Sequence, residues 1–217
     1  MEQDLSDYRK SYDKKELLEK NVPADNPFDL FKQWFNDADK DESVNEANAM
    51  TISTIGLDGF PKSRVVLLKK IKDQGFVFFT NYESEKGTAL QNNPKACISF
   101  FWESAERQII IKGEVKKLSD IENNEYFQSR PKGSKLGAIA SNQSEVIKSR
   151  QVLESRLSNL EAKFGDDDFI PRPKHWGGFI LQPIELEFWQ GRPNRLHDRL
   201  RYLRLEANEW QLDRLSP

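Results

Sequence analysis

Four separate clusters of cationic and hydroxyl side chains are the parts of this sequence that could bind anions. In the first cluster, Arg64 and Lys69 stand at the two ends of one apolar, β-branched run. Because side chains alternate along a regular strand, residues five apart point to opposite faces, and each cation could meet a different anion. Taken alone, this run is more simply interpreted as a strand whose two end residues, Arg64 and Lys69, keep their charged groups in water.

The second and third clusters lie where helices are expected to begin. Ser84 precedes a short helix that carries Lys86, and a serine cap, unpaired backbone N–H groups and a lysine suit a phosphate. Tyr126, Arg130 and Ser134 surround a junction between two helices, where a planar guanidinium and hydroxyls could hold a phosphate dianion. A simple helix cap and an exposed turn remain the alternatives for these two clusters.

The fourth cluster is formed by Arg195, His197 and Arg199, which alternate shortly after Trp189. In an extended segment these three side chains would face one side. Neighbouring positive charge disfavours a protonated imidazole, so His197 is expected to be neutral near pH 7. A single histidine is more often structural than catalytic, but one between two arginines on the same side is less ordinary.

Composition excludes several other kinds of site and partner. The 217-residue chain has 33 Lys and Arg against 35 Asp and Glu, and this net charge of −2 argues against a nucleic-acid surface. One cysteine and two histidines leave no pattern for a metal site. Cys97 lies in an apolar run, where a buried, inert thiol is expected. No membrane-spanning run or secretory leader is visible, so a soluble cytoplasmic protein is expected.

No familiar catalytic motif is present in the sequence. It contains neither a glycine-rich nucleotide loop nor a Gly-x-Ser-x-Gly segment. Several anion-binding clusters remain, without an evident nucleophile or acid–base pair. That pattern suits an enzyme whose cofactor performs the chemistry.

The elements that must position these clusters follow an α+β pattern. Apolar spacing, caps and breakers predict helices over 4–20, from Pro27 onward, and over 84–91, 119–129, 133–140 and 145–164. Alternation and turn signals predict strands from residue 49 to the Asp58-Gly59 turn, then over 64–69, 76–80, 96–102, 108–117, 176–189 with a break at Pro183, 201–205 and 210–215. Short strands of this kind predict one antiparallel barrel with helices outside it.

Six segments of the chain occur in the order and with the spacing of one known family. They are Arg64-Val65-Val66-Leu67-Leu68-Lys69, Phe78-Phe79-Thr80-Asn81, Tyr126-Phe127 with Ser129-Arg130-Pro131, Ser141-Asn142-Gln143-Ser144, Phe188-Trp189-Gln190-Gly191 and Arg195-Leu196-His197-Asp198-Arg199. From about Tyr8 to its C-terminus the chain resembles the pyridoxamine 5′-phosphate oxidase family. The last two segments are the most specific of the six.

The resemblance implies an FMN-dependent oxidase that forms pyridoxal 5′-phosphate from pyridoxamine 5′-phosphate or pyridoxine 5′-phosphate. Dioxygen would be the acceptor, with release of hydrogen peroxide and, from the amine, ammonia. The implied fold is an FMN-binding split barrel, and the implied assembly is a homodimer with two flavins at the subunit interface. No metal, nucleic acid or membrane is implied.

The resemblance also assigns roles to individual residues. FMN would contact Arg64, Val65, Val66, Leu67, Leu68, Lys69, Phe79, Thr80, Lys86, Gln108, Gln143, Ser144, Trp189 and Arg199, with Arg64 and Lys86 on its phosphate. The substrate would contact Arg9, Lys10, Ser11, Tyr12, Lys69, Tyr126, Arg130, Ser134, Arg195, Leu196 and His197. Lys69, Tyr126, Arg130 and Ser134 would hold its phosphate. Arg195 and His197 would be the catalytic pair beside its ring.

Three features depart from the family pattern. The family usually has Ser-Arg-Lys where this chain has Ser84-Glu85-Lys86, so Glu85 either points to solvent or weakens FMN binding. Its usual Tyr-Thr is Phe79-Thr80 here, which removes a phenol. The segment 9–12 matches a lid-like part of the family but is less basic than usual. Residues 1–22 are therefore expected to form an N-terminal helical or lid segment, and residues 23–217 a single flavin-binding domain.

Other functions stay open at this point. Another split-barrel flavoprotein, such as an FMN-dependent reductase that uses a nicotinamide, would not need the phosphate cluster and the Arg195–His197 pair together. A non-catalytic protein that carries FMN or pyridoxal phosphate would keep the binding residues without turnover. A structural interaction protein, with its basic residues solvated, would take up no FMN.

Overall fold

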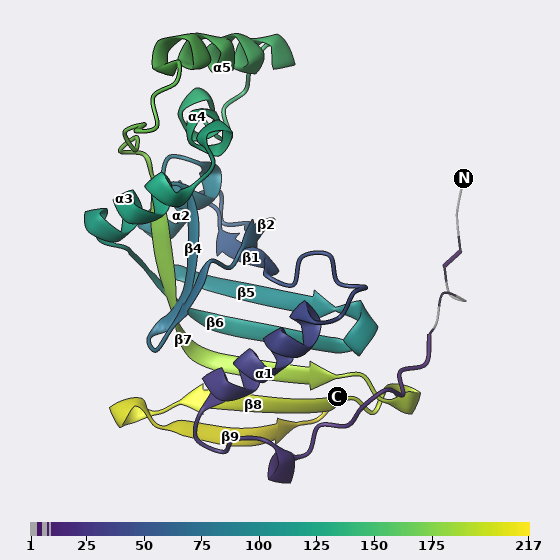
Figure 1. Cartoon of the computed structure of the whole chain (residues 1–217). Coiled ribbons are helices and arrows are strands. Elements are labelled where there is room, and N and C mark those ends of the chain that lie inside the picture. The colour runs from purple at the N-terminus through teal and green to yellow at the C-terminus, as the bar shows by residue number, and fades with distance from the viewer. Residues whose placement is uncertain (1–3, 6–7, 9) are drawn as a thin grey trace. The chain divides into compact units, whose positions relative to one another are not determined.

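The computed structural model describes residues 4, 5, 8 and 10–217 (Figure 1). The chain divides into two compact units. Unit 1 contains Met1–Thr51, Cys97–Lys112 and Pro183–Pro217, and unit 2 contains Ile52–Ala96 and Gly113–Gln182. The predicted boundary between residues 1–22 and 23–217 stays a prediction.

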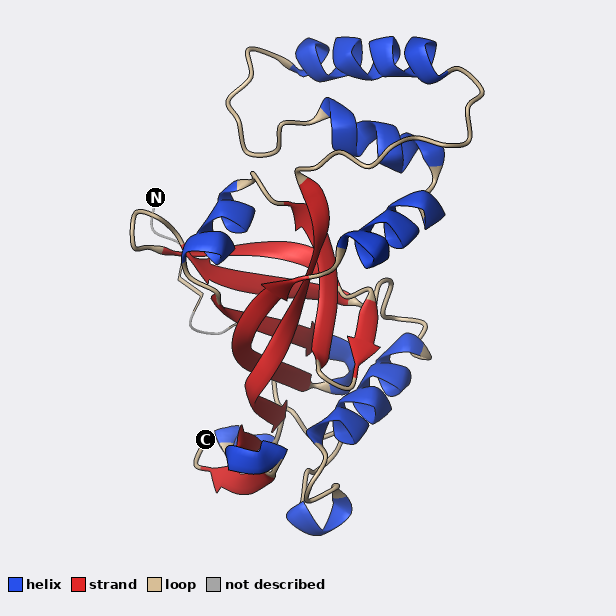
Figure 2. Cartoon of the chain, turned by 90° about the vertical axis from the view of Figure 1, so that its left-hand side faces the viewer, coloured by secondary structure: helices blue, strands red, loops and turns tan. Residues whose placement is uncertain are grey.

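The chain contains both helices and antiparallel strands (Figure 2). The helices are α1 Pro27–Asp39, α2 Glu85–Asn92, α3 Asp120–Ser129, α4 Lys132–Ala140 and α5 Arg150–Phe164. The strands are β1 Ala49–Ile55, β2 Pro61–Leu67, β3 Lys70–Lys72, β4 Gly75–Asn81, β5 Lys95–Trp102, β6 Arg107–Lys117, β7 Trp176–Gln190, β8 Asp198–Arg204 and β9 Trp210–Leu215. Their order in the sheet is β2-β1-β5-β6-β7-β4-β3, with β8 paired to β7 and β9 to β8. The predicted α+β class is confirmed.

The predicted break of β7 at Pro183 is wrong, because this strand continues through the proline. On the N-terminal side, residues up to Leu181 pair with β4. On the C-terminal side, residues from Glu185 onward pair with β8. Pro183 falls between these two ladders, where its missing N–H removes no bond from either register.

Each unit has its own apolar core. In unit 2, β4 is buried almost throughout, and Phe78 lies opposite Phe179 of β7. In unit 1, Trp34 of α1 packs edge-on against Phe188, with ring centroids 5.3 Å apart. Phe188 in turn packs edge-on against Tyr202 of β8 at 5.7 Å. These contacts hold the ends of β7 that carry the candidate site residues.

The start of α1 follows the local sequence signals. Asn26 is the N-cap, its side-chain oxygen accepts a hydrogen bond from the Phe28 N–H at 3.1 Å, and Pro27 occupies the first helical position. Because the cap satisfies a backbone donor that the helix leaves unpaired, we expect Asn26→Ala to lower the free energy of unfolding by about 1 kcal/mol. Urea denaturation measures this change. The control is Asn36→Ala on the exposed face of the same helix, which should change stability by less than half as much.

The predicted helix over 4–20 is wrong. The described residues before Glu19 are not helical, and a single 3-10 turn covers Glu19–Asn21. Backbone N–H groups that a helix would use donate instead to distant carboxylates. The Asp13 and Lys14 N–H groups both bind Glu106, at 3.0 and 3.1 Å. The Leu17 N–H donates to the Asp198 carboxylate at 3.0 Å, and the Leu17 side chain is buried in unit 1.

The long helix near the middle of the chain begins later than predicted. The predicted start is residue 145, but α5 begins at Arg150, and the Val146 side chain is fully exposed. Toward the C-terminal end of α5, its apolar side chains pack against the rest of unit 2. There Leu157, Leu160 and Phe164 pack, partly buried, against the cluster of Phe127, Leu136, Ile170 and Trp176.

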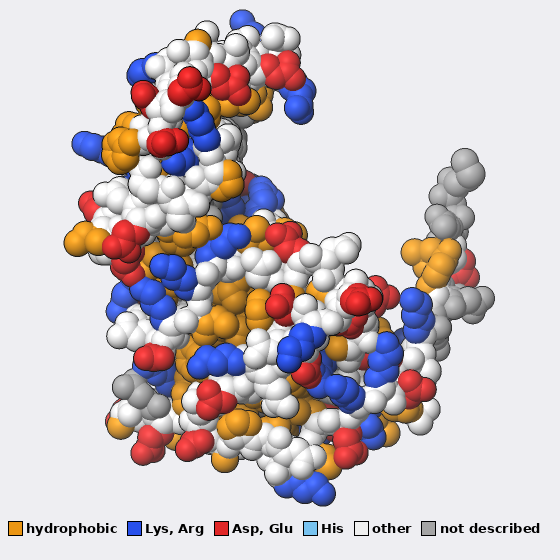
Figure 3. Space-filling model, in the orientation of Figure 1, with side chains coloured by type: hydrophobic (Ala, Val, Ile, Leu, Met, Phe, Trp, Pro, Cys, Tyr) orange, Lys and Arg blue, Asp and Glu red, His pale blue; other side chains and the backbone are white. Residues whose placement is uncertain are grey.

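On the face in Figure 3, basic and acidic side chains are interspersed, without one large basic patch. No helix in the described ranges is long and apolar enough to span a bilayer. Within the same ranges, no three His, Cys, Asp or Glu side chains are grouped so that they could hold a metal ion.

Candidate active site

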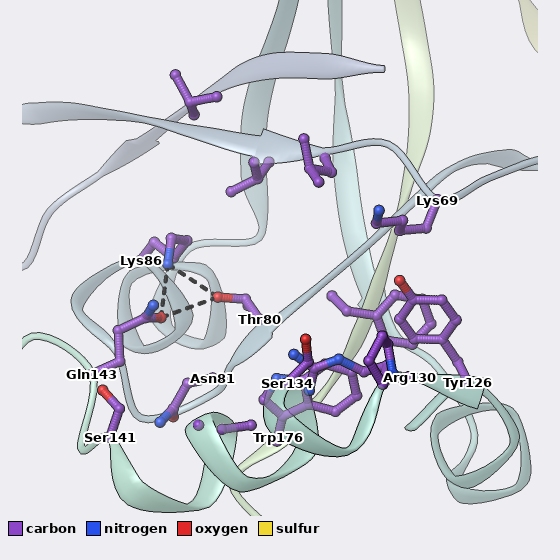
Figure 4. A pocket seen from close by; sticks show the side chains of 17 residues that line it. Lys69, Thr80, Asn81, Lys86, Tyr126, Arg130, Ser134, Ser141, Gln143 and Trp176 are labelled. Atoms are coloured by element: carbon purple, nitrogen blue, oxygen red, sulfur yellow. Dashed lines mark hydrogen bonds between the residues drawn. The ribbon is translucent and has the colours of Figure 1, made fainter. Parts of the chain in front are cut away.

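Unit 2 contains a cavity of about 520 Å³ that gathers most of the cationic and hydroxyl clusters (Figure 4). The residues predicted from the family pattern that line it are Val65, Val66, Leu67, Lys69, Phe79, Thr80, Lys86, Tyr126, Arg130, Ser134 and Gln143. Lys86 and Arg130 lie at different ends of the group (Figure 4). The cavity therefore has two separate cationic ends.

The first end is built around Lys86 in the first turn of α2. Its ammonium donates hydrogen bonds to Thr80 Oγ1 and to Gln143 Oε1, both at 3.0 Å. Burial lowers the pKa of Lys86, and the positive charge of Arg64 lowers it further. An anion at this end would restore a negative partner to a partly desolvated lysine.

The position of Lys86 depends on the tight turn before α2. The Ser84 Oγ accepts a hydrogen bond from the Gly87 N–H, so the predicted cap is present. A Cβ on Gly87 would come within 2.5 Å of the Asn81 and Tyr82 carbonyl oxygens. Only glycine lets the helix start so close to the end of β4.

The second end is built around Arg130, where α3 stops and α4 starts. Arg130 is the C-cap of α3, and its guanidinium lies 4.5 Å from the Trp176 ring centroid. Its Nη1 is buried without a hydrogen-bond partner, and burial lowers the Arg130 pKa. Ser134, in the first turn of α4, and Tyr126, on α3, line the cavity beside it. A buried guanidinium nitrogen without a hydrogen-bond partner is suited to bind an anion.

Lys69 lies on the Arg130 side of the cavity (Figure 4), outside the strand in which it was predicted. Strand β2 ends at Leu67, so the regular alternation between Arg64 and Lys69 does not apply. The Lys69 N–H donates to the Val77 carbonyl at 2.8 Å, which fixes the backbone beside β4. Lys69 and Arg64 nevertheless lie in different places, because Lys69 lines the cavity and Arg64 does not.

An aromatic group lies beside the second end. The rings of Phe79 and Tyr126 stack with centroids 3.8 Å apart, and Phe79 also stacks on Trp176 at 5.4 Å. Sequence reasoning missed Trp176, together with Asn81, Pro131, Gly137, Ala138 and Ser141, which also line the cavity. Trp176 stands at the start of β7 without a motif around it, so no local signal marks it.

The remaining predicted residues of unit 2 do not line the cavity. Leu68 is buried in the core. The Ser144 Oγ accepts a hydrogen bond from the Glu85 N–H at 3.2 Å, at the start of α2. Arg64 donates to the Glu85 carboxylate at 2.8 Å. Their cofactor roles stay predictions.

Unit 1 contains a second hollow of about 430 Å³, which is lined by Tyr8, Lys10, Ser11, Tyr12, Arg192, Asn194, Arg195 and His197. The His197 ring packs on Trp189, with centroids 4.7 Å apart, and Tyr12 packs edge-on against both rings. Lys10, Ser11, Tyr12, Arg195 and His197 were predicted to meet substrate, and the hollow brings them together. Arg9 lies outside the described residues.

The predicted extended segment from Arg195 to Arg199 is wrong. Pro193–Arg195 form a 3-10 turn in which Asn194 and Arg195 have φ of 58° and 61°, so only Arg199 belongs to a strand. Arg199 donates to the Glu187 carboxylate at 2.7 Å, and Leu196 is 69% exposed. Outside this segment, the predicted FMN contact Gln108 is half-buried on β6. The left-handed backbone of Asn194 and Arg195 is uncommon outside glycine, and residues with this conformation cluster at functional sites.

The charge state of His197 follows from its surroundings. Its Nδ1 accepts a hydrogen bond from the Arg192 N–H at 3.1 Å, so in the neutral ring the proton is on Nε2. Burial lowers the His197 pKa below 6.5, and the charge of Arg195 lowers it further. The imidazole is therefore neutral at pH 7, and as pH falls through the lowered pKa, protonation removes the acceptor for Arg192.

We expect an NMR titration of the His197 ring protons to give a midpoint below 6.5. Arg195→Gln should raise this midpoint only part of the way, because burial, the larger cause, remains. A His175→Asn variant assigns the signal of the other histidine. A midpoint at or above the ordinary value in the unmodified protein would contradict the expectation.

Comparison with known proteins decides the family. The family model described as pyridoxamine 5′-phosphate oxidase matches residues 37–164, and the model described as pyridoxine 5′-phosphate oxidase C-terminal dimerisation region matches residues 176–217. The chain belongs to the pyridoxamine 5′-phosphate oxidase family. The resemblance found in the sequence is thereby confirmed.

Relatives of this family match over nearly the whole chain. A pyridoxine/pyridoxamine 5′-phosphate oxidase of Flavobacterium johnsoniae is 60% identical, with 98% of this chain and 99% of the relative covered. One from Christiangramia forsetii is 57% identical over the full length of both chains. Among solved structures, PhzG from Burkholderia lata in complex with tetrahydrophenazine-1-carboxylic acid is 32% identical, with a TM-score of 0.85 and 96% and 100% coverage. The fold expected for the family is thus confirmed.

Proposed function

We propose that this protein is an FMN-dependent oxidase that converts pyridoxamine 5′-phosphate and pyridoxine 5′-phosphate to pyridoxal 5′-phosphate. Dioxygen accepts the electrons, hydrogen peroxide is released, and the amine substrate also gives ammonia. One observation carries the proposal: a single cavity has two separate cationic ends, and at one of them Arg130 Nη1 is buried without a hydrogen-bond partner. The cofactor and the substrate each carry one phosphate, and each end suits one of them. The names of relatives up to 60% identical support the same activity.

The residues present fit FMN. The partly desolvated ammonium of Lys86, with Thr80 and Gln143 beside it, is a donor set that suits the cofactor phosphate. Bound FMN would supply the two-electron oxidation and the subsequent reaction with dioxygen. The chain's own residues would supply binding and orientation.

The other end would bind the substrate phosphate. Arg130 offers a planar fork, and Lys69, Tyr126 and Ser134 add a point charge and two hydroxyls. Holding both phosphates restricts the relative orientation of the two ligands, which is a recognised source of rate acceleration. Arg195 and the neutral His197 would lie against the substrate ring. His197 has a proton on Nε2 to donate there, since Arg192 occupies its Nδ1.

We propose a homodimer with two flavins at the subunit interface. The match of residues 176–217 to a dimerisation region supports the assembly. In unit 2, Leu57, Phe60 and Val65 on and around β2 are about 70% exposed (71, 69 and 71%), which is costly for apolar side chains that stay in water. The cytoplasm stays the predicted location.

The deciding experiment combines an absorbance spectrum with a turnover assay. Purified protein loaded with FMN should turn yellow, and with pyridoxine 5′-phosphate in air it should produce an aldehyde absorbance and peroxide. Flavin-loaded protein that forms neither product would overturn the oxidase proposal. Flavin reduction by a nicotinamide without aldehyde formation would instead support a reductase. Bound flavin without any turnover would support a carrier.

A further inference from the structure

A carboxylate lies between two cations at the start of α2. Arg64 Nη2 donates to Glu85 Oε2 at 2.8 Å, and the Lys62 ammonium pairs with Glu85 Oε1. Both carboxylate oxygens are therefore engaged. The paired lysine lowers the pKa of Glu85, so this carboxylate stays ionised at neutral pH.

This ion pair lies next to the Lys86 end of the cavity. Lys86 follows Glu85 in the chain, and its ammonium is within electrostatic reach of both charges: Arg64 lowers its pKa and Glu85 raises it. The residue after Arg64, Val65, lines the cavity, whereas Arg64 itself does not. The Arg64 guanidinium is thus close enough to Lys86 to lower its pKa, but it is paired with Glu85.

A phosphate at the Lys86 end and the Glu85 carboxylate would compete for the same guanidinium. An arginine fork binds one oxyanion in the bidentate manner, and two anions close together repel each other. Glu85 also occupies the first turn of α2, where the helix dipole favours a negative group. Its N–H is already bonded to the Ser144 hydroxyl, so the carboxylate is anchored there by its own backbone.

We propose that Glu85 sets the affinity of this protein for the phosphate of its cofactor by holding Arg64 away from it. The inference rests on the proposed FMN-dependent function and extends it. Phosphate binding must either release Arg64 from Glu85 or proceed at the Lys86 end without Arg64. In both cases the phosphate group of FMN adds less affinity here than it would with a neutral residue at position 85.

The test is a set of fluorescence titrations of flavin-free, full-length protein with FMN and with riboflavin, which lacks the phosphate. Glu85→Gln should bind FMN about fivefold more tightly than the unmodified protein, since a partly exposed ion pair of this kind has a modest net effect. Riboflavin affinity should not change. The matched control is Asp58→Asn, which removes a carboxylate that lies 3.7 Å from Lys62 without an ion pair to Arg64. It should change FMN affinity by less than about twofold.

A double-mutant cycle separates the two ways in which Glu85 could act. If Glu85 acts by holding Arg64, the gain from Glu85→Gln should vanish when Arg64→Met is already present. If the gain persists, long-range repulsion is the cause and the inference fails. Thermal unfolding of each variant verifies that it is folded.

The outcomes distinguish this inference from the function on which it rests. Tight FMN binding by the unmodified protein with no gain in Glu85→Gln would overturn the role of Glu85 alone. An equal gain for riboflavin would also overturn it, because the phosphate would not be involved. No FMN binding by any variant would overturn the proposed cofactor and this inference with it.

Discussion

Replacing Arg130 with methionine is expected to lower kcat/KM for pyridoxine 5′-phosphate about 100-fold, because charge-assisted bonds to a phosphate are worth roughly 1.5–3 kcal/mol each. The Arg130 guanidinium lies over the Trp176 and Phe127 rings, at 4.5 and 5.6 Å, and its Nη1 has no hydrogen-bond partner. The side chain is therefore held in place before any anion arrives. Steady-state kinetics with varied substrate concentration measure the loss, which should appear mainly in KM.

Arg130→Met should change the stability of the protein much less than it changes its activity. Methionine keeps an unbranched apolar stem over the rings and removes a cation that has a buried nitrogen without a hydrogen-bond partner, so the free energy of unfolding should stay within about 1 kcal/mol of the original. Arg150→Met is the matched control in the same unit, because its guanidinium is exposed and paired with Glu154. It should leave kcat/KM unchanged. A loss of activity toward unphosphorylated pyridoxine as large as that toward the phosphorylated substrate would contradict a phosphate-binding role.

Elements with short-range signals could be predicted from the sequence. The Asn26-Pro27 pair marks the start of α1, and Ser84 marks the start of α2. In α3, Ser119 and Glu122 form a capping box, which satisfies backbone groups at both positions. Each of these signals lies within four residues of the helix end that it determines, so no distant part of the chain is needed.

Segments with distant partners could not be predicted in the same way. The charged stretch before Glu19 has helix-forming residues, but its N–H groups bind Glu106 and Asp198. Those acceptors are about 90 and 181 residues away in sequence. The turn at Arg195 likewise depends on tertiary structure, since a left-handed arginine is unfavourable without support from its surroundings.

The candidate site also has residues that local motifs predict and residues that only the tertiary structure brings in. The residue types at both ends of the cavity could be identified from the family pattern, because each motif places a charged or hydroxyl group at a fixed position. Trp176 joins the cavity only through the pairing of β7 with β4, which no local signal encodes. The charge reversal at Glu85 was visible in the sequence. Its pairing with Arg64, from a strand 21 residues earlier, was not.

Replacing Arg195 with leucine is expected to lower kcat/KM about 100-fold or more while FMN still binds, since loss of one positioned donor at a reacting group has about this effect. Arg195 lines the hollow of unit 1, whereas the proposed cofactor phosphate site lies at Lys86 in unit 2. The Arg195 side chain has no hydrogen bond or ion pair among the described residues. Its charge is thus free to meet a ligand. Turnover and flavin absorbance, measured on the same sample, separate the two effects.

The backbone at Arg195 provides a control that separates chemistry from folding. With φ of 61°, Arg195 is in a region that costs other residues about 1 kcal/mol and suits glycine. Arg195→Gly should therefore be at least as stable as the original protein in urea denaturation, and equally inactive. Arg195→Lys keeps a positive charge without the planar fork and should retain intermediate activity. Full turnover in the glycine variant would show that the guanidinium does not act on the substrate, whatever the leucine variant does.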